Sequence, residues 1–399
     1  MSRNLRLTCG LGLFLFCASL ALADFTAPAK NVSKSALDSM YPKIAGADGS
    51  LNVYIIWTEY VSSTEQHLYF AKSSNSGATW GTPVQLTFGG QIYSASPKDA
   101  YSLCVDEPYI HIVYNWRSTD SDDWEISYYR SDDSGATWDL PIYLTKNTSE
   151  SLYPDVAARG SYVHVTYQDD YSGVEQILYK RITNYGAGAV DQIRQLTSSG
   201  GVHNYPKIAV SESGEHVSIV YVNNYNVQYN IAYIHIYAYG AGAYDSRQLT
   251  TSASSANMSA DITTSTGADD QYVYIVYMGN WPGNWDIMYK RLNSYGQAGF
   301  TTYTARLTYS DTESDYPVVD FDSISNNVHI SFFDNWTGNE DVMYRKLTNF
   351  GGAGFTGQRV SWGTGESICP TISSASAQAY IAWMDNSSGN YEIYVKYGN

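Results

Sequence analysis

The octapeptide Ser131-Asp132-Asp133-Ser134-Gly135-Ala136-Thr137-Trp138 lies between two runs of β-branched and aromatic residues. Asp133 is placed to accept hydrogen bonds from backbone N–H groups of its own turn, and Gly135 can adopt a positive φ. Trp138 can bury its ring beside the flanking strands. The pattern therefore predicts a β-hairpin whose turn is closed by its own side chains.

An imperfect copy of this octapeptide begins at Ser73 and carries Asn75, Gly77 and Trp80 at the matching positions. The two copies lie 58 positions apart, a spacing that indicates a repeated unit of the size of a propeller blade. Later units replace the octapeptide with turns in which Tyr-Gly or Phe-Gly is followed by another Gly two or three residues later, at residues 184–188, 239–242, 295–299 and 350–354. We interpret these as diverged copies of one turn.

A dipeptide of the Leu-Thr type closes a strand seven times along the chain. The copies are Leu86-Thr87, Leu144-Thr145, Leu196-Thr197, Leu249-Thr250, Leu307-Thr308 and the variants Val360-Ser361 and Val32-Ser33. Most copies are followed about ten residues later by a strand that begins with Pro, where no ladder N–H is lost. A strand of alternating aromatic and β-branched residues, a polar loop, a third strand and the hairpin complete each unit. The 38 Tyr among 399 residues also favour an all-β fold.

The last unit ends at Asn399 after three strands, and Val32-Ser33 has no strands before it. We therefore expect residues 25–34 to supply the outer strand of the last blade and to close the ring, which leaves no sheet edge open. The prediction is an all-β, seven-bladed β-propeller of four-stranded blades, forming a single domain over residues 24–399. An open run of units, or two stacked domains, is the alternative, but no linker-like segment supports it.

The first 23 residues have the pattern of a secretory signal peptide. Arg3 and Arg6 precede an apolar run, and Ala21-Leu22-Ala23 forms an A-x-A cleavage site before Asp24. Without this leader 21 basic and 39 acidic residues remain, a formal charge of −18. Such a surface repels nucleic acid and anionic lipid. We therefore expect a secreted or periplasmic monomer that binds neither nucleic acid nor membrane.

The octapeptide is similar to the Asp-box, or bacterial neuraminidase repeat, and the surrounding unit resembles a blade of the sialidase-like propeller superfamily. The strict motif covers one turn, or two if Asn75 is accepted, whereas the looser blade pattern covers nearly the whole mature chain. The resemblance implies that the Asp-box residues are structural and lie on the face opposite the functional one. These residues are Ser131, Asp133, Gly135, Trp138, Asn75, Gly77 and Trp80.

The resemblance does not extend to sialidase catalysis. Enzymes of that superfamily hold a substrate carboxylate with three arginines, the first in an F/Y-R-I-P motif, and this chain has Tyr41-Pro42-Lys43-Ile44 in its place. Most arginines recur at equivalent blade positions, which indicates a scaffold role. Only Arg117 and Arg159 stand outside that pattern. The chain therefore lacks three arginines that could hold a substrate carboxylate through bidentate hydrogen bonds.

The loops on the face opposite the hairpins interleave aromatic residues with Asp and Asn, a combination typical of neutral-sugar binding. The predicted glycan-binding residues are Trp116, Arg117, Tyr171, Tyr225, Trp281, Trp285, Asp334, Trp336 and Asp385. Asp, Asn and Gly also form tight turns, so each residue has a structural interpretation as well. The partner that we expect is an extracellular glycan or polysaccharide, and we lean towards binding without catalysis.

Two alternatives remain open. A glycoside hydrolase or polysaccharide lyase could use loop carboxylates, with Asp169, Asp170, Asp334 and His203 as candidate catalytic residues. A protein-interaction scaffold would instead present a flat apolar patch. We predict no cofactor and no metal site, but Asp120, Asp122 and Asp123 leave Ca²⁺ as an option. His111, His164 and His329 alternate within strands at equivalent positions and are interpreted as packing residues.

Overall fold

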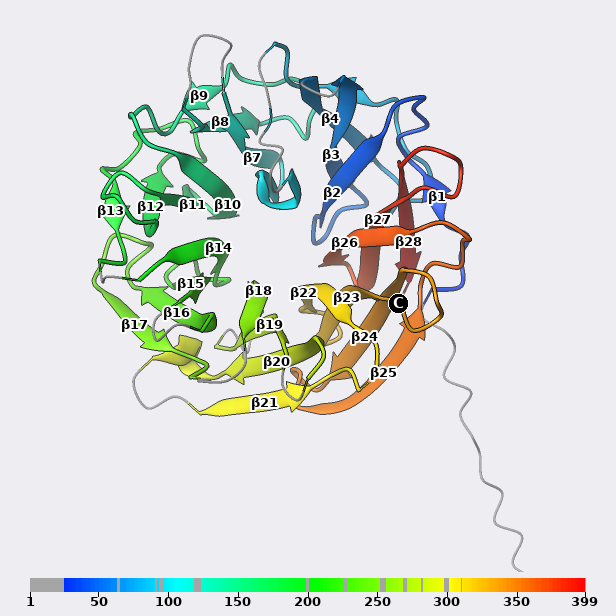
Figure 1. Cartoon of the computed structure of the whole chain (residues 1–399). Helices are drawn as coiled ribbons and strands as arrows, with labels where there is room; N and C mark the ends of the chain where they lie inside the picture. Colours follow the sequence, from blue (N-terminus) through cyan, green and yellow to red (C-terminus); the bar gives the residue numbers. More distant parts are fainter. Residues whose placement is uncertain are drawn as a thin grey trace, which may run out of the picture.

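The computed structural model describes residues 25–62, 65–89, 92, 97–117, 123–198, 201–224, 228–251, 256–267, 271–280, 283–297, 301–309 and 311–398. These residues form seven four-stranded antiparallel sheets around a central axis, which is a seven-bladed β-propeller (Figure 1). The predicted fold class is confirmed. Among the described residues no helix is long and apolar enough to cross a membrane.

Each blade has the same strand order, from the innermost first strand to the outermost fourth. Blade 1 contains β2 (Ser39–Gly46), β3 (Val53–Ser62), β4 (Glu65–Ser73) and β5 (Val84–Gln85). Blade 2 contains β6 (Tyr101–Asp106), β7 (Tyr109–Trp116), β8 (Glu125–Ser131) and β9 (Ile142–Tyr143). Blade 3 contains β10 (Ser151–Arg159), β11 (Tyr162–Asp169), β12 (Gln176–Ile182) and β13 (Arg194–Gln195).

The remaining blades follow the same plan. Blade 4 contains β14 (His203–Val210), β15 (Val217–Asn223), β16 (Asn230–Ile236) and β17 (Tyr244–Gln248). Blade 5 contains β18 (Asn257–Thr264), β19 (Val273–Gly279), β20 (Asp286–Leu292) and β21 (Thr302–Arg306). Blade 6 contains β22 (Ser314–Asp322), β23 (Asn327–Asp334), β24 (Asp341–Thr348) and β25 (Ala353–Arg359). Two short 3₁₀ turns, η1 (Pro97–Asp99) and η2 (Ser294–Gly296), lie between strands.

Blade 7 is assembled from both ends of the chain. It contains β26 (Ser367–Ala375), β27 (Gln378–Asp385) and β28 (Glu392–Gly398), and its fourth strand is β1 (Lys30–Asn31). Lys30 lies opposite Val395, and Asn31 lies opposite Tyr394, in an antiparallel pair. The N-terminal strand thus hydrogen-bonds to the C-terminal strand and leaves the two-residue β1 as the outer edge of that sheet.

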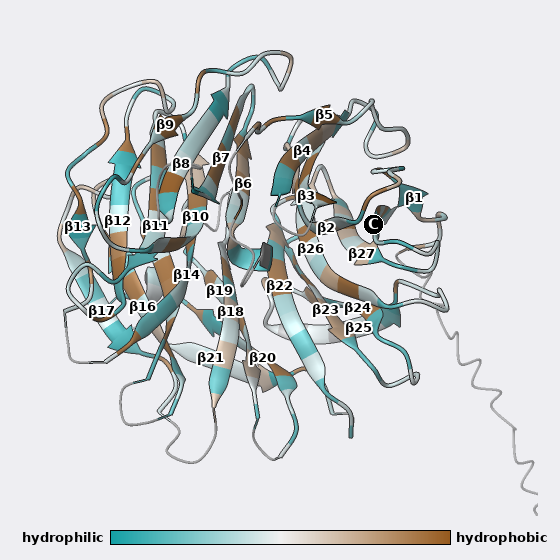
Figure 2. Ribbon diagram, turned by 45° about the horizontal axis from the view of Figure 1, so that its top comes forward, coloured by the Kyte–Doolittle hydropathy of each residue, from teal (hydrophilic) through white to brown (hydrophobic). Residues whose placement is uncertain are grey.

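The hydrophobic core lies between adjacent blades. Every residue of β15 and of β19 is buried, because a second strand has a neighbouring blade on each side. Strands that are covered on both faces carry nearly continuous apolar runs rather than strict alternation. Figure 2 shows this concentration of hydrophobic residues along the strands.

The repeated Leu-Thr dipeptide has one structural role in all seven blades. Its hydroxyl accepts a hydrogen bond from a backbone N–H of the third strand, at 2.7–3.0 Å. The pairs are Thr87 with Leu68, Thr145 with Ile126, Thr197 with Ile177, Thr250 with Ile231, Thr308 with Ile287, Ser361 with Val342 and Ser33 with Ile393. The hydroxyl therefore satisfies a buried donor at the point where the short fourth strand ends.

The Asp-box turns are closed by their own side chains. Asp133 Oδ1 accepts from Thr137 N at 2.8 Å, and Ser131 Oγ accepts from Gly135 N at 2.9 Å. Gly135 has φ +82°, and a Cβ there would lie 2.6 Å from the Phe70 ring. The Trp138 ring packs edge-on against Phe70 of blade 1 at 5.1 Å. This hairpin therefore helps to join blades 1 and 2.

The copy in blade 1 has the same bonds. Asn75 Oδ1 accepts from Thr79 N at 2.8 Å, and Ser73 Oγ accepts from Gly77 N at 2.9 Å. Gly77 has φ +78°, and the partly buried Trp80 packs against the core shared by blades 1 and 7. We call the face that carries these turns the hairpin face. The opposite face, which carries the connections between second and third strands, is called the loop face.

Candidate functional site

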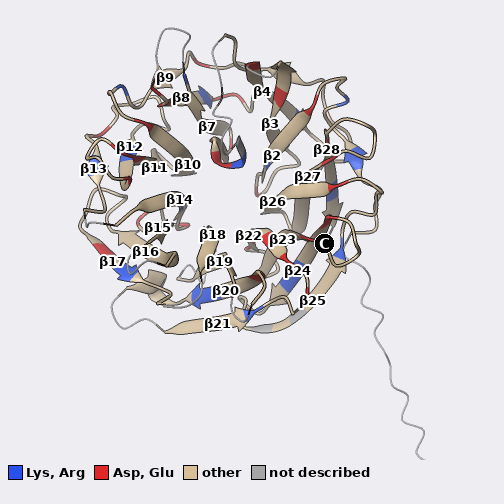
Figure 3. Cartoon of the chain, viewed as in Figure 1, with Lys and Arg blue, Asp and Glu red and all other residues tan. Residues whose placement is uncertain are grey.

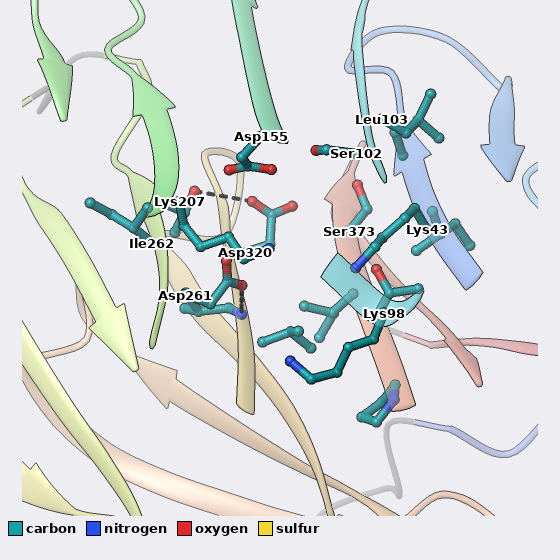
Figure 4. Close-up of a pocket in the computed structure, with 18 of the residues that line it drawn as sticks. Lys43, Lys98, Ser102, Leu103, Asp155, Lys207, Asp261, Ile262, Asp320 and Ser373 are labelled. Atoms are coloured by element: carbon teal, nitrogen blue, oxygen red, sulfur yellow. Dashed lines mark hydrogen bonds between the residues drawn. The ribbon is translucent and has the colours of Figure 1, made fainter. Parts of the chain in front are cut away.

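A cavity of about 480 Å³ occupies the centre of the ring and is lined by the first strands of all seven blades (Figure 4). Its volume lies within the range of small-molecule binding sites. Six of the seven first strands contain a register shift near their loop-face end. Such a β-bulge redirects a side chain, and bulges are common beside binding sites.

The bulge explains the Tyr-Pro dipeptides of the sequence. The residue before the Pro adopts a left-handed conformation in Tyr41 (φ 56°), Tyr153 (φ 54°), Tyr205 (φ 53°), Tyr316 (φ 50°) and Cys369 (φ 51°). Ser259 holds the same place in blade 5, with φ 47°. Non-glycine residues adopt this conformation at an energetic cost and persist in it where the surrounding structure imposes it. All of these positions except Tyr153 line the cavity.

Three of these tyrosines, Tyr41, Tyr205 and Tyr316, line the cavity itself. Burial raises the pKa of Tyr316 to about 12, with additional contributions from Cys369 and Asp315, so its phenol is neutral at physiological pH. The Lys98 ammonium lies 4.5 Å from the centre of the Tyr316 ring. We call this set, Tyr41, Tyr205, Tyr316 and Lys98, the tyrosine mouth.

The turn η1 enters the cavity from blade 2, which lacks the bulge; it is the short cyan coil inside the ring in Figure 1 and carries both charges in Figure 3. Asp99 accepts from Lys207 Nζ of blade 4 at 3.1 Å and also pairs with Lys98. Burial alone would raise the pKa of Asp99, but Lys98, Lys207 and Lys43 outweigh it and hold that pKa below its usual range. The turn therefore ties blade 2 to blade 4 across the cavity.

Lys43 is a cation of the cavity whose pKa lies below its ordinary value. Burial, and then repulsion from Lys207, lower the pKa of Lys43 to about 8. Asp155, Asp261 and Asp320 stand on other first strands of the wall. The cavity thus contains both signs of charge.

The wall aspartates join neighbouring blades. Asp155 Oδ2 accepts from Ile208 N at 2.7 Å, and Asp261 Oδ2 accepts from Val319 N at 2.9 Å. Burial raises the pKa of Asp261 to about 6 and that of Asp320 to about 7. These carboxyl groups satisfy backbone donors that face the cavity, which is a structural role.

A second group of polar residues stands beside the tyrosine mouth on the loop face of blades 6 and 7. Burial, and then the charges of Glu313, Glu340 and Asp334, raise the pKa of Asp315 to about 6. Tyr391 Oη donates to Glu366 Oε2 at 2.5 Å. A carboxyl group whose pKa is raised to about 6 can act as a proton donor.

The predicted catalytic aspartates, and the predicted glycan-binding residue Asp385, have structural partners. Asp169, Asp334 and Asp385 end the second strands of blades 3, 6 and 7, and all three are buried. Each accepts from the serine that begins the first strand of its blade: Ser151 Oγ at 2.7 Å, Ser314 Oγ at 2.6 Å and Ser367 Oγ at 2.6 Å. Each also accepts the N–H of a residue in the following loop. Asp170 accepts from Glu150 N at 3.0 Å.

His203, predicted as a catalytic candidate in the loop before Tyr205-Pro206, lies in a strand instead. His203 is the first residue of β14, and it is buried against the Tyr221 ring at 5.5 Å between ring centres. It occupies the blade 4 position at which blades 3, 6 and 7 have serine. The strand begins earlier than the Pro indicates, because the bulge lets it continue past the Tyr-Pro pair.

The predicted glycan-binding residues occupy different environments. Tyr171 and Trp336 are exposed, Trp116 is half-buried at the end of β7, and Trp285 packs partly against the core of blades 5 and 6. The Arg117 guanidinium lies 4.6 Å from the Trp124 ring. Tyr225 and Trp281, together with Asp120 and Asp122, lie outside the described residues. Nowhere in the described part of the chain do three His, Cys, Asp or Glu side chains gather in a way that could hold a metal ion.

The repeated histidines and arginines belong to the scaffold. His111, His164 and His329 are buried, and each Nδ1 pairs with a tyrosine hydroxyl of the third strand at 2.6–2.7 Å. Arg181 Nε bonds Asp191 at 2.8 Å, and Arg291 donates to the carbonyl of Phe350 at 2.6 Å. These contacts give the side chains structural partners within and between blades.

Sequence reasoning missed the tyrosine mouth, Lys98 and Asp315. The Tyr-Pro dipeptides were visible, but they were interpreted as strand starts. Their recurrence with the same aromatic residue before Pro was the signal that could have identified a bulge. Nothing local marks Lys98 or Asp315, since their environments depend on contacts between blades.

The fold and the cavity together define a seven-bladed propeller with a ligand-sized central site. No family model and no curated protein matches this chain. Solved structures with a similar fold include an ulvan lyase bound to a GlcA-Rha3S saccharide, at 10% identity and TM-score 0.61, covering 92% of this chain and 95% of that one. The phage phi92 endosialidase matches at 10% identity and TM-score 0.54, over 94% of this chain and 69% of its own. An α-L-arabinofuranosidase from Fusarium graminearum matches at 12% identity and TM-score 0.52, over 78% and 93%.

Proposed function

We propose that this protein binds an extracellular glycan at the tyrosine mouth. The observation that carries the proposal is the set of strained positions that directs Tyr41, Tyr205 and Tyr316 into one ligand-sized cavity beside Lys98. Aromatic rings stack on the apolar face of a pyranose, while phenol and ammonium groups bind its hydroxyls. The solved structures named above act on or bind carbohydrates by their descriptions, which supports the same ligand class here.

A glycan array tests this proposal, with residues 24–399 applied with and without Ca²⁺. Tyr316→Ser removes one ring of the mouth and suits the backbone, because Ser259 already occupies this bulge position in blade 5. We expect at least a tenfold loss of affinity, typical of an aromatic residue central to a binding site. Tyr143→Ser, at an exposed tyrosine of the outer strand β9, is the matched control.

If Tyr316→Ser binds glycan as tightly as the wild-type protein, the tyrosine mouth is not the binding site. If the wild-type protein binds no glycan on the array, the proposed function is contradicted and a protein-interaction scaffold is favoured. Urea unfolding of each variant shows whether a loss of affinity comes from the site or from the fold.

Asp315 favours a second candidate function, a glycoside hydrolase or polysaccharide lyase. Its carboxyl group has a pKa of about 6, and Asp315 precedes the mouth residue Tyr316 in β22, so we propose that it donates a proton to a leaving group. The test is the appearance of reducing ends or unsaturated products from bound polysaccharide at pH 5–7. Asp315→Asn should abolish product formation and preserve binding. Absence of product from the wild-type protein leaves binding as the function.

We also propose that the protein is exported after removal of residues 1–23 and acts as a monomer. The A-x-A pattern before Asp24 supports the cleavage. The outer strands of blades 1, 2, 3 and 7 are only two residues long, which supports the monomer because such short edges offer little backbone for pairing with a second copy.

A further inference from the structure

The outer rim of blades 5 and 6 carries one arrangement of side chains twice. In blade 5, Arg306 Nη2 lies 2.6 Å from Asp286 Oδ2, and Arg306 Nε donates to the carbonyl of Thr308 at 2.8 Å. The guanidinium of Arg306 lies 4.8 Å from the centre of the Tyr309 ring. The arginine is thus held by two contacts while it stacks on the aromatic residue that follows the Leu-Thr dipeptide.

Blade 6 repeats the arrangement at equivalent positions. Arg359 Nη2 lies 2.7 Å from Asp341 Oδ2, and Arg359 Nε donates to the carbonyl of Ser361 at 2.8 Å. Its guanidinium lies 4.6 Å from the centre of the Trp362 ring. Asp286 and Asp341 are both fully buried, so each arginine is anchored to the blade interior rather than to a mobile surface group.

These two aromatic rings are held in place and are nevertheless open to solvent. Tyr309 is 69% exposed and Trp362 is 71% exposed, although a guanidinium stacks on each. A cation stacked on a ring restricts its orientation. Each residue therefore presents an aromatic face to solvent with little rotamer freedom left to lose on binding.

Trp336 adds a third exposed ring to blade 6, at 69% exposure. Its backbone N–H donates to Asp334 at 2.6 Å, and the neighbouring Thr337 donates to Asp341, which also anchors Arg359. One buried carboxylate therefore organises the loops that carry both tryptophans. We call Tyr309, Trp362 and Trp336 the aromatic rim.

Blades 1, 3 and 4 lack the arginine that is anchored to a buried aspartate in blades 5 and 6. Blades 1, 3 and 4 have Gln85, Gln195 and Gln248 at the position of the arginine, each donating to a backbone carbonyl. Phe88 follows the dipeptide in blade 1 and is 74% exposed, and its blade has Gln85 in place of the arginine. An exposed aromatic residue thus follows the dipeptide both with the anchored arginine, in blades 5 and 6, and without it, in blade 1. Phe88 therefore serves as a control for the role of the arginine.

The chemistry of the rim favours a carbohydrate over a protein. Its rings stand singly among Thr, Ser, Gly, Asn and Asp residues, in the stretches 308–312, 335–339 and 361–365. Protein interfaces are built around a contiguous, well-packed apolar core, which such spacing does not offer. Separate rings surrounded by hydroxyl and amide groups match a sugar chain, whose units alternate apolar faces with hydroxyls.

We propose that the aromatic rim is a second glycan-binding site, which makes the protein a binder of extended polysaccharide rather than of a short oligosaccharide. The proposal rests on the proposed function of the tyrosine mouth. Tyr309 and Trp362 follow the fourth strands and the mouth lies at the first strands, so these two rings are separated from the mouth by roughly 14 Å, three strand spacings of about 4.8 Å. Trp336 lies between them across the sheet, in the loop that joins β23 and β24. One chain that contacts both sites gains affinity because the second contact is intramolecular.

Affinity electrophoresis in gels containing soluble xylan, laminarin or alginate, followed by titration calorimetry with the retained polymer and its trisaccharide, tests the proposal. The variant is Tyr309→Ser combined with Trp362→Ser, and Phe88→Ser is the matched control. We expect the double variant to lose about tenfold or more in affinity for the polymer. Its affinity for the trisaccharide, set by the tyrosine mouth, should stay within twofold of wild type, as should both affinities of Phe88→Ser.

The outcomes separate the two proposals. Unchanged polymer affinity in the double variant overturns the second site and leaves the mouth intact. An equal loss in Phe88→Ser also overturns it, because the anchored arginines then have no role. Trisaccharide binding that is lost in Tyr316→Ser but kept in the double variant supports the mouth, and a loss of polymer affinity in the double variant supports the rim. Failure of the wild-type protein to bind any polysaccharide overturns the proposed function and the rim together.

Discussion

Thr197→Val tests the repeated hydroxyl contact that closes every blade. Thr197 Oγ1 accepts from Ile177 N at 2.9 Å and donates to Gln176 Oε1 at 2.8 Å, and all three residues are buried. Valine has nearly the same shape but no hydroxyl. The substitution therefore leaves one backbone donor and one side-chain acceptor without their partner in a place that water does not reach.

The expected cost follows from these two groups. A buried N–H without an acceptor costs about 1–3 kcal/mol, and the lost bond to Gln176 adds about 1 kcal/mol. We expect a loss of about 2–4 kcal/mol in the free energy of unfolding. An unfolding entropy of about 2.1 cal/mol/K per residue gives roughly 0.8 kcal/mol per kelvin for a domain of this size, so the melting temperature should fall by about 3–5 °C.

Differential scanning calorimetry of residues 24–399 measures the change, with Thr197→Ser as the control. Serine keeps the hydroxyl and loses one methyl group, which costs about 1 kcal/mol. The expected order of stability is wild type, then Thr197→Ser, then Thr197→Val. If valine proves as stable as serine or more so, the hydroxyl contact is not a source of stability and the reasoning fails for all seven blades.

Four further outcomes follow from the described contacts. Burial raises the pKa of Asp320 to about 7, so its carboxyl group destabilises the folded state increasingly as pH rises from about 4 to about 7. Melting measured as a function of pH should therefore show Asp320→Asn gaining stability relative to wild type across that window. Burial lowers the pKa of His164 to about 3, so its contribution to stability is present above about pH 6.5 and is lost on acidification towards pH 4; His164→Gln should flatten that part of the melting profile. Asp133, whose pKa is lowered to about 2 by hydrogen bonds from its own turn, should stabilise the hairpin without touching the ligand, so that Asp133→Ala lowers the melting temperature and leaves the glycan-array profile unchanged. Mass spectrometry of the exported protein should find an N-terminus at Asp24, and retention of Ala23 would contradict the proposed cleavage site.

The repeats were predictable because each blade is a local object. Strand alternation, the turn at Gly135 and the hydroxyl of Thr197 act within about 60 residues of chain, so their signals recur in the sequence at a fixed spacing. Seven copies of the dipeptide indicated seven blades. The position of Ser33, before any complete unit, likewise pointed to the last blade, where its hydroxyl accepts from Ile393 N at 2.9 Å.

The candidate site was not predictable in the same way, because its environments arise between blades. Asp169 and Asp334 were predicted as catalytic candidates and Asp385 as a glycan-binding residue, and the folded blades surround all three with serine hydroxyls and loop N–H groups. Asp99 and Lys207 are 108 positions apart in the sequence and 3.1 Å apart in the cavity.

The sequence by itself thus determined the class of fold, the number of blades and the turns, since these depend on periodicity and on contacts near in the chain. Only the tertiary structure decided which tyrosines face the centre, which carboxyl groups are buried and which aromatic rings remain open. The reason is physical: exposure and pKa depend on the charges and the packing that neighbouring blades bring to a residue, and these neighbours come from distant parts of the chain.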